Sequence, residues 1–140
     1  WTLHQYSIIS GKSNTIWSDY GKPMKQILNT FKKGTFHNIK MHDNGLIWAG
    51  EKGKALTWMD TVINGKPTTP RTGYDVEVNA LWYNAVMYSL ELAAEAGDTT
   101  FVSSWEKWPE IIKSNFNEVF WNPESGYLAD YVDSDYKDMA

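Results

Sequence analysis

Residues 56–84, LTWMDTVINGKPTTPRTGYDVEVNALWYN, decide how the rest of the chain is interpreted. They place one acid, Asp60, close to the aromatic Trp58. An arginine, Arg71, follows in an irregular polar segment, and two more acids, Asp75 and Glu77, mark the start of a helix. A carboxyl group near an indole ring is partly desolvated, which raises its pKa and favours the protonated form. Asp60 is therefore a candidate general acid.

The clearest helix of the chain is predicted at the end of this stretch, over residues 76–96. Its apolar residues recur every three to four positions, as in a helix with one buried face: Val78, Leu81, Trp82, Ala85, Val86, Leu90 and Ala93. Glu77 lies in the first turn, where the helix dipole favours a negative charge, so electrostatics alone can explain this acid. Gly97 is expected to end the helix.

Further helices are predicted from apolar residues at helical spacing, near residues 1–10, 22–33 and 100–118. Residues 13–15 are predicted to form a turn. Pro23 suits the first position of the second helix, where its missing N–H costs nothing. Pro109 interrupts the last helix, so we expect a kink or a break near Trp108.

The segments between these helices are predicted to be long and mostly irregular. Residues 35–74 begin with a small hairpin that turns at residues 43–45 and continue as a connection rich in glycine and proline. Residues 119–131 are predicted as a second loop. Connections of this length in a compact domain are usually functional or disordered. We therefore predict one all-α unit over residues 1–140 with a small hairpin and long active-site loops.

The composition is that of a folded, mildly acidic chain. It has 140 residues, 42% of them hydrophobic and 21% charged, with a net charge of −4. A charge of this size and sign argues against a nucleic-acid or anionic-membrane partner, and no apolar run is long enough to span a bilayer. The sequence has no cysteine and only three scattered histidines, which disfavours a metal site. We predict no metal, no cofactor and a cytoplasmic location.

Aromatic residues are the outstanding compositional feature, with 8 Trp and 8 Tyr. Aromatic rings stack on the C–H faces of sugars, but they also fill protein cores. We expect most of them to be core residues and a minority to line a ligand groove.

Several blocks of the sequence together resemble the glucosidase region of glycogen debranching enzymes, the amylo-α-1,6-glucosidase family. The central blocks are LTWMD at 56–60, TPR at 69–71 and VEVNALWYN at 76–84, and the flanking ones are LIWAG at 46–50, FWN at 120–122 and GYL at 126–128. The resemblance extends over about residues 19–130. Two departures lie next to the proposed site. Tyr74 and Asp75 stand where the family usually has a basic residue and a proline, and Thr61 replaces a usual alanine.

The resemblance implies a fold and a division of labour. The family's glucosidase domain resembles the glucoamylase-like (α/α)6 barrel, which is several times longer than this chain. We therefore expect an internal fragment of such a barrel. Helix faces that are covered in a whole barrel would be exposed in a fragment, so self-association is expected.

The resemblance also implies roles for individual residues. Asp60 would be the general acid of an inverting hydrolysis of α-1,6-linked glucose on glycogen or a related α-glucan. Arg71 and Glu77 would bind hydroxyls of the cleaved glucose. Aromatic residues expected near the substrate are Trp48, Trp58, Tyr83, Trp121 and Tyr127. In inverting enzymes the acid and the base lie roughly 6.5–9.5 Å apart. The family's base lies beyond Ala140, so these residues alone are expected to be inactive.

Two other readings remain open at this stage. A non-catalytic, helical glucan-binding module would need the aromatic residues and Arg71, but no ionisable acid at Asp60. Another inverting α-glycosidase on the same barrel, such as a trehalase or glucoamylase relative, would differ in the residues that flank the acid. The sequence TWMD at 57–60 favours the debranching family.

Overall fold

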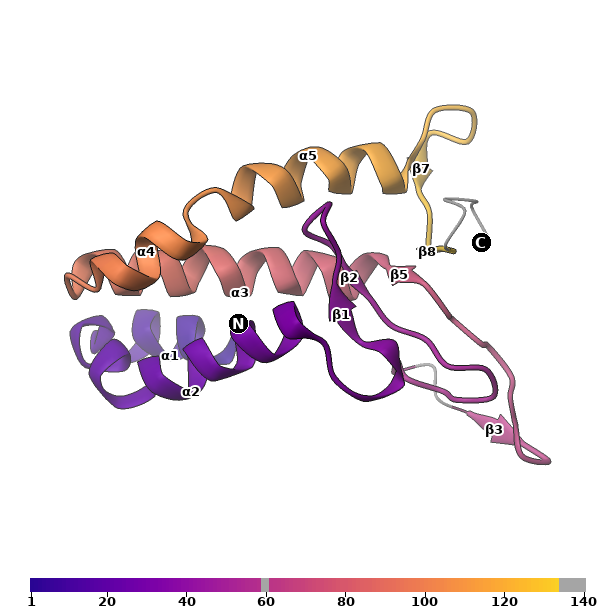
Figure 1. The fold of residues 1–140 in the computed structure, drawn as a ribbon, viewed down its shortest axis with the longest axis horizontal. Coiled ribbons are helices and arrows are strands. Elements are labelled where there is room, and N and C mark those ends of the chain that lie inside the picture. Colours follow the sequence, from indigo (N-terminus) through magenta and orange to yellow (C-terminus); the bar gives the residue numbers. More distant parts are fainter. Residues whose placement is uncertain (59–60, 134–140) are drawn as a thin grey trace.

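The structure of the chain, a computed structural model, describes residues 1–58 and 61–133. This part of the chain is mostly helical, with short strands gathered at one end (Figure 1). The α-helices are α1 (Thr2–Ser10), α2 (Ser13–Lys33), α3 (Val76–Glu95), α4 (Thr99–Trp105) and α5 (Trp108–Phe120). In the described part of the chain, no helix is long and apolar enough to cross a membrane.

Helix α3 is the central element, because α2 packs on one side of it and α4 and α5 pack on the other (Figure 1). Helix α1 packs against α2. Helix α3 buries Trp82, Val86 and Ala93 in the main core, where Trp82 contacts Trp105 of α4 and Phe31 of α2. Tyr88 and Leu92 belong to a second, smaller core with α2. A helix with neighbours on two sides needs apolar residues around most of its circumference, whereas the sequence predicted one buried face for α3.

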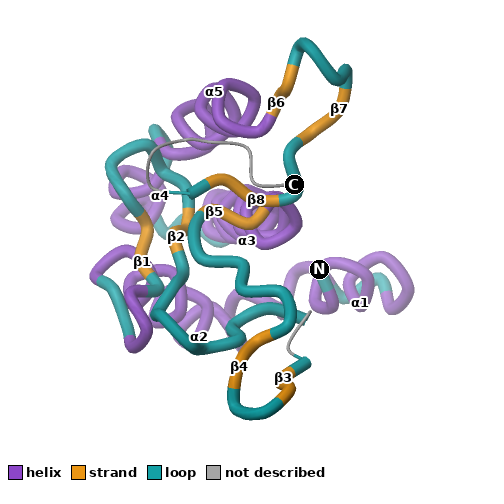
Figure 2. Tube along the Cα trace, turned by 90° about the vertical axis from the view of Figure 1, so that its right-hand side faces the viewer, coloured by secondary structure: helices purple, strands orange, loops and turns teal. Residues whose placement is uncertain are grey.

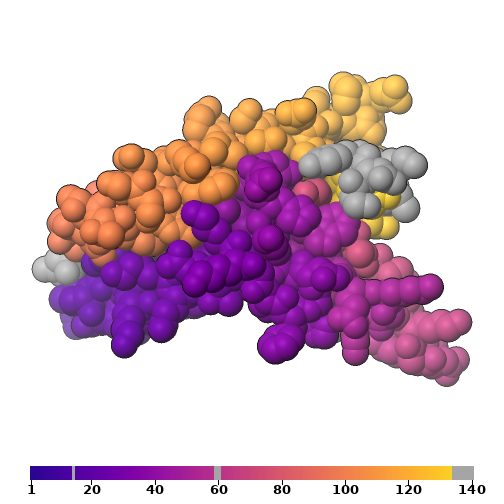
Figure 3. Space-filling view, viewed as in Figure 1, coloured from indigo at the N-terminus to yellow at the C-terminus, as the bar shows by residue number. Residues whose placement is uncertain are grey.

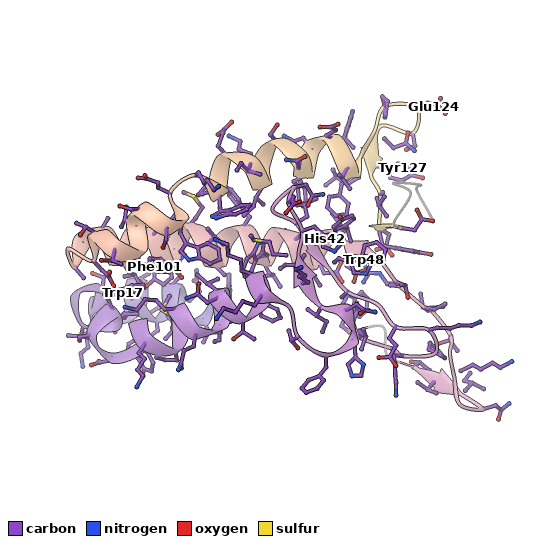
Figure 4. All side chains as sticks on the ribbon, viewed as in Figure 1. Trp17, His42, Trp48, Phe101, Glu124 and Tyr127 are labelled. Carbon is purple, nitrogen blue, oxygen red and sulfur yellow. The ribbon has the colours of Figure 1, made fainter. Side chains whose placement is uncertain are left out.

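The main core is built largely from aromatic rings. Trp82 meets Trp105 edge to face with ring centroids 6.0 Å apart, and Phe101 stacks on Trp105 at the same distance. Trp17 of α2 faces Phe101 of α4 across the gap between these helices (Figure 4). The ammonium group of Lys32 lies 5.0 Å from the Trp105 ring centroid, a favourable cation–π distance. Most tryptophans in this region thus have a packing role.

Helix α2 is longer than predicted and begins at Ser13, so the expected turn at residues 13–15 is its first turn. Pro23 lies inside the helix, and its predicted place at the first position is wrong. A proline in a helix interior removes one hydrogen bond. Burial of Ile16, which is 1% exposed, against Tyr88 and Leu92 offsets that loss and extends the helix past the proline.

The helix predicted near residues 100–118 is two helices, and α5 continues to Phe120. The helix is interrupted between Trp105 and Trp108, where the sequence predicted a kink or a break. Pro109 lies in the first turn of α5, where its missing N–H leaves no carbonyl unpaired. Asp98 caps α4 by accepting a hydrogen bond of 3.1 Å from the backbone N–H of Phe101.

Eight short strands form four antiparallel pairs in the described residues. The pairs are β1 (Lys40–Met41) with β2 (Ile47–Trp48), β3 (Val62–Ile63) with β4 (Lys66–Pro67), β5 (Tyr74–Asp75) with β8 (Tyr131–Val132), and β6 (Trp121–Asn122) with β7 (Tyr127–Leu128). A 3-10 turn, η1 (Phe36–Asn38), precedes β1. The β1–β2 pair is the expected hairpin around residues 43–45. The loops predicted over residues 35–74 and 119–131 thus contain paired strands.

Two side chains of α3 fasten the β1–β2 hairpin to the helix. Asn79 is fully buried; its amide oxygen accepts from the N–H of Ile47 at 2.6 Å, and its amide nitrogen donates to the Ile47 carbonyl at 3.0 Å. The indole N–H of Trp82 donates to the Gly45 carbonyl at 3.0 Å. Asn79 therefore acts as a strand partner supplied by a helix, and it fixes the position of Trp48 next to Ile47.

Strand β5 lies between β2 and β8 at the beginning of α3 (Figure 2). Ala49 and Gly73 exchange backbone hydrogen bonds of 2.8 and 2.9 Å, and β5 pairs with β8 on its other side. Gly73 has a φ of 148°, and a Cβ atom there would lie 2.1 Å from the Val132 carbonyl oxygen. Only glycine permits this close approach. The approach brings three distant segments together at the N-terminal end of α3.

Candidate active site at the N-terminal end of α3

A buried ion pair between Arg71 and Glu77 is the centre of the candidate site. The Arg71 side chain is 1% exposed and that of Glu77 is 33% exposed. The two terminal nitrogens of Arg71 donate to the two carboxylate oxygens of Glu77 at 2.5 and 2.7 Å. Such a two-pronged, charge-assisted pair is among the strongest polar contacts that a protein can make. It fixes the Glu77 carboxylate in one orientation with one side open to solvent.

The guanidinium of Arg71 has two further carboxylate neighbours, Asp130 and Asp75. Its Nη2 donates to the Asp130 backbone carbonyl at 2.9 Å and to Asp130 Oδ1 at 3.3 Å. Its Nε lies 3.1 Å from Asp130 Oδ2 and 3.3 Å from Asp75 Oδ1. Three carboxylates from the start of α3, from β5 and from the residue before β8 therefore surround a single cation.

Trp58 completes the polar contacts of Glu77. Its indole N–H donates to Glu77 Oε1 at 2.9 Å, while 70% of the residue is exposed. A large aromatic side chain that is exposed and yet held by a hydrogen bond presents a fixed flat face to solvent. This arrangement suits stacking on a ligand with C–H faces.

The carboxyl groups of the site have different pKa values for physical reasons. The hydrogen bond from Arg71 lowers the pKa of Glu77, with smaller help from Trp58, so Glu77 is ionised near neutral pH. Burial raises the pKa of Asp75 to about 7 against the opposing attraction of Arg71. Glu77 is therefore an acceptor of hydrogen bonds and no general acid, whereas Asp75 holds a proton over part of the neutral range.

Trp48 lies beside this cluster in an aromatic group of its own. The His42 ring lies parallel to the Trp48 ring, with ring centroids 5.9 Å apart (Figure 4). Tyr74 meets both rings edge on. His42 Nδ1 and the Tyr74 hydroxyl are 2.7 Å apart. Successive residues of a strand point to opposite faces, so Tyr74 directs this group away from the face of β5 that carries Asp75. Among the described residues, Trp48 contacts Tyr74, the neighbour of Asp75, and makes no hydrogen bond to Glu77.

Trp121 and Tyr127 lie on the β6–β7 hairpin. Figure 4 shows Tyr127 at the same end of the molecule as Trp48. Trp121 and Tyr127 are 51% and 55% exposed, so neither is a core residue. This hairpin and the β3–β4 loop project from the end that carries the site (Figure 3). The two rings are available to a ligand at this end.

Tyr83 belongs to a different part of the surface. It lines a shallow hollow between α3 and α5 together with Ala80 and Phe116. No described contact links it to Arg71 or Glu77. Of the residues expected near the substrate, the structure brings Trp58, Arg71 and Glu77 into direct contact and leaves Tyr83 apart.

Asp60, the residue expected to be the general acid, lies outside the described residues. Asp130 and Asp75 are the site residues that the sequence analysis did not assign. Asp130 is 59 positions from Arg71 in the sequence, and no local sequence pattern predicts their contact. Asp75 adjoins the recognised helix start, but its burial depends on the pairing of β5 with β8. No group of three or more metal-ligating side chains is present in the described residues.

Comparison with known proteins supplies the family. The family model described as amylo-alpha-1,6-glucosidase matches residues 1–140. The chain is also similar to a glycogen debranching enzyme of Saccharomyces cerevisiae, with 28% identity over 106 residues. That match covers 62% of this chain and 7% of the relative, so the chain spans a small part of that protein. No solved structure matches the chain.

The family match covers the whole chain and agrees with the resemblance of the 56–84 stretch, so that interpretation is confirmed. The three central blocks that carry the resemblance supply Trp58, Arg71 and Glu77, which are in contact in the structure. This chain belongs to the amylo-alpha-1,6-glucosidase family.

Proposed function

We propose that this chain is part of a glycogen debranching enzyme and contributes the acid side of an α-1,6-glucosidase site. The family match and the similarity to the Saccharomyces cerevisiae protein support the substrate class, a glycogen or related α-glucan. The single observation that carries the proposal is the Glu77 carboxylate. It is ionised, held by Arg71 and Trp58, and open on one side.

In this proposal Glu77 accepts hydrogen bonds from hydroxyl groups of the glucose unit that is removed. A carboxylate accepts two such bonds well when its orientation is fixed, because little conformational freedom is lost on binding. Arg71 is buried, and its terminal nitrogens already donate hydrogen bonds to Glu77 and Asp130. We assign it the task of holding Glu77, in place of the direct sugar contact expected from the resemblance. Trp58, with Trp121 and Tyr127, supplies aromatic walls.

Asp60 is proposed as the general acid on the basis of the sequence. In the sequence it follows Trp58, whose indole N–H donates to Glu77, by two positions. The inverting mechanism requires a second carboxylate that activates water on the other face of the sugar. We propose that this base comes from outside the 140 residues, as part of a complete (α/α)6 barrel, and that the chain alone is inactive. A cytoplasmic location belongs to the same proposal.

The test is release of free glucose from a branched dextrin with single-glucose stubs, assayed with the intact enzyme that contains this chain. Asp60→Asn is expected to reduce turnover by about 10²–10⁴-fold, the usual contribution of a general acid. Glu77→Gln is expected to raise KM with a smaller effect on kcat. Glu91→Gln serves as the control, because Glu91 is exposed on the same helix and far from its N-terminal end.

Two results would overturn the proposal. Normal glucose release by the Asp60→Asn enzyme would remove the general acid. Glucan binding that survives Asp60→Ala, in an intact protein without turnover, would favour the non-catalytic glucan-binding module. Wild-type activity of Glu77→Gln would leave the hydrolase but remove Glu77 from the substrate site.

Self-association is a separate part of the proposal. Ile9 is 84% exposed on α1, and Ile27 and Leu81 are 55% and 58% exposed on α2 and α3. Apolar side chains at this exposure favour contact between copies of the isolated chain. Sedimentation of the 140-residue chain is expected to give a concentration-dependent mass, and a constant monomer mass would contradict it.

A further inference from the structure

Asp75 is a buried carboxyl group to which the proposed mechanism gives no task. The residue is 1% exposed, and its Oδ1 atom has no hydrogen-bond partner among the described residues. It lines a mostly apolar hollow of about 350 Å³ between α2 and α3, where it is the only charged side chain among the described lining residues. A buried carboxylate without a hydrogen bond is costly, so the position favours the neutral acid.

The charges around Asp75 are unbalanced. Arg71 is the only arginine of the chain, and it faces Glu77 and Asp130 as well as Asp75. With all three acids ionised, the cluster would carry one positive and three negative charges. Tyr131, paired with Asp75 across β5 and β8, adds a hydroxyl group but no charge near neutral pH. The other described side chains that line the hollow are uncharged.

Two carboxylates compete for one N–H group of Arg71. The Nε atom lies 3.3 Å from Asp75 Oδ1 and 3.1 Å from Asp130 Oδ2, and it makes a well-aligned hydrogen bond to neither. The terminal nitrogens of the same planar group hold Glu77. Because the guanidinium is planar and rigid, an attraction that moves Nε also rotates the two terminal nitrogens that donate to Glu77.

We propose that Asp75 is a positioning residue for Glu77, which sets through its protonation state how firmly Arg71 holds that carboxylate. When Asp75 is protonated and neutral, Arg71 remains paired with Glu77 and Asp130. When Asp75 is ionised, it attracts Arg71 Nε toward β5 and repels the carboxylates of Glu77 and Asp130. Both effects weaken the paired hydrogen bonds from Arg71 to Glu77. The functional consequence rests on the proposed role of Glu77 in binding sugar hydroxyls.

The geometry gives the pH range of this effect. Burial raises the pKa of Asp75 to about 7, with Glu77 and Asp130 adding to the shift and Arg71 opposing it. The paired hydrogen bonds from Arg71 to Glu77 are therefore expected to be stronger at pH 6 than at pH 8. Glu77 does not supply this transition, because its hydrogen bonds with Arg71 lower the pKa of its carboxyl group.

The first test uses the single arginine of the chain. Its Nε–H gives the only arginine side-chain signal of that kind in a proton–nitrogen NMR spectrum of the 140-residue chain. In the wild type this signal is expected to shift between pH 5.5 and 8.5 with a midpoint near 7. Asp75→Asn, which keeps the shape and removes the charge, is expected to abolish the shift.

Asp130→Asn is the matched control, because Asp130 competes for the same Nε atom. The transition should persist in this variant with a lower midpoint, since one neighbouring negative charge is removed. A wild-type signal that does not titrate, or that titrates equally in Asp75→Asn, would overturn the proposal. A signal that exchanges with water too quickly to be seen at pH 6 would contradict the burial of Arg71 and overturn it as well.

The second test measures KM for the branched dextrin with the intact enzyme at pH 6 and pH 8. The rise in KM between these values is expected to be about fivefold larger in the wild type than in Asp75→Asn, a coupling of ordinary size. Parallel KM profiles would overturn the positioning role. If Glu77→Gln leaves KM unchanged while the NMR transition is present, the proposed function of Glu77 fails and the Asp75–Arg71 coupling stands.

Discussion

The two ends of α3 are stabilised by different contacts. At its N-terminal end, a guanidinium that is 1% exposed meets three carboxylates from separate segments. At its C-terminal end, the neighbouring ion pair joins Lys25 and Asp98 at 2.9 Å, with side chains 39% and 22% exposed. Packing at this second end comes mainly from aromatic rings such as Phe101.

The comparison shows how burial changes the meaning of a salt bridge. Charges removed from water are tolerated only with well-made partners, so a buried pair enforces one arrangement of the segments that supply it. An exposed pair is screened by solvent and permits many arrangements. The N-terminal end of α3 therefore has the fixed geometry that a binding site requires, and the C-terminal end has the packing that a scaffold requires.

The largest expected effect is that of Arg71→Met, which removes the cation and keeps much of the side-chain volume. Three carboxylates would lose their partner, so the free energy of unfolding should fall by about 3–5 kcal/mol at pH 7. Arg71 lowers the pKa of Glu77, so this pair contributes stability above the usual glutamate pKa and loses it in acid. Urea unfolding at pH 7 and pH 4 should therefore show a smaller loss at pH 4. Equal losses at both values would mean that lost packing dominates.

At the opposite end, Phe101→Ala should destabilise the protein by about 3 kcal/mol. Phe101 is 4% exposed and contacts Trp17 and Trp105, so truncation leaves a cavity that its neighbours can only partly fill. This loss involves no ionisable group and should be the same at pH 4 and pH 7. A pH dependence like that of Arg71→Met would blur the distinction between the two ends.

A smaller effect of opposite sign is expected for Asp75→Asn. The pKa of Asp75 is raised in the folded state, so its burial is harmless in acid and becomes destabilising as pH rises from about 4 to about 7. The variant should match the wild type near pH 4 and exceed its stability by about 2–3 kcal/mol at pH 8. Thermal unfolding across this range measures the difference. A variant that is less stable than the wild type at pH 8 would contradict the cost assigned to the ionised form.

The smallest effect should come from Lys25→Met, the exposed counterpart of Arg71→Met. Loss of this pair is expected to change the free energy of unfolding by less than about 1 kcal/mol, and less still at high salt. Urea unfolding with and without 1 M NaCl provides the measurement. A loss as large as that of Arg71→Met would show that burial does not separate the two pairs.

Much of the helical framework was predictable because helix signals are local. Apolar spacing indicated α3, and Pro109 indicated the break before α5. The same local reasoning placed Pro23 at a helix start, since the sequence around it could not reveal how deeply Ile16 would be buried. Tertiary packing overrode the local signal there.

The candidate site was predicted in part. Trp58, Arg71 and Glu77 were named from their blocks, and they are in contact in the structure. Asp130 was not connected to them, because its contact depends on the antiparallel pairing of β5 with β8. Tyr83, which belongs to the same block as Glu77, lies at another hollow because six positions along a helix rotate a side chain to a different face.

The amino-acid sequence alone determined the family, the mostly helical class and the identity of the arginine and glutamate at the centre of the site. These properties follow from residue types and from short-range spacing along the chain. Only the tertiary structure decided that Arg71 is buried, that three acids share it and that Asp75 Oδ1 has no hydrogen-bond partner among the described residues. Burial and charge balance depend on segments that are far apart in the chain and meet only when β8 pairs with β5.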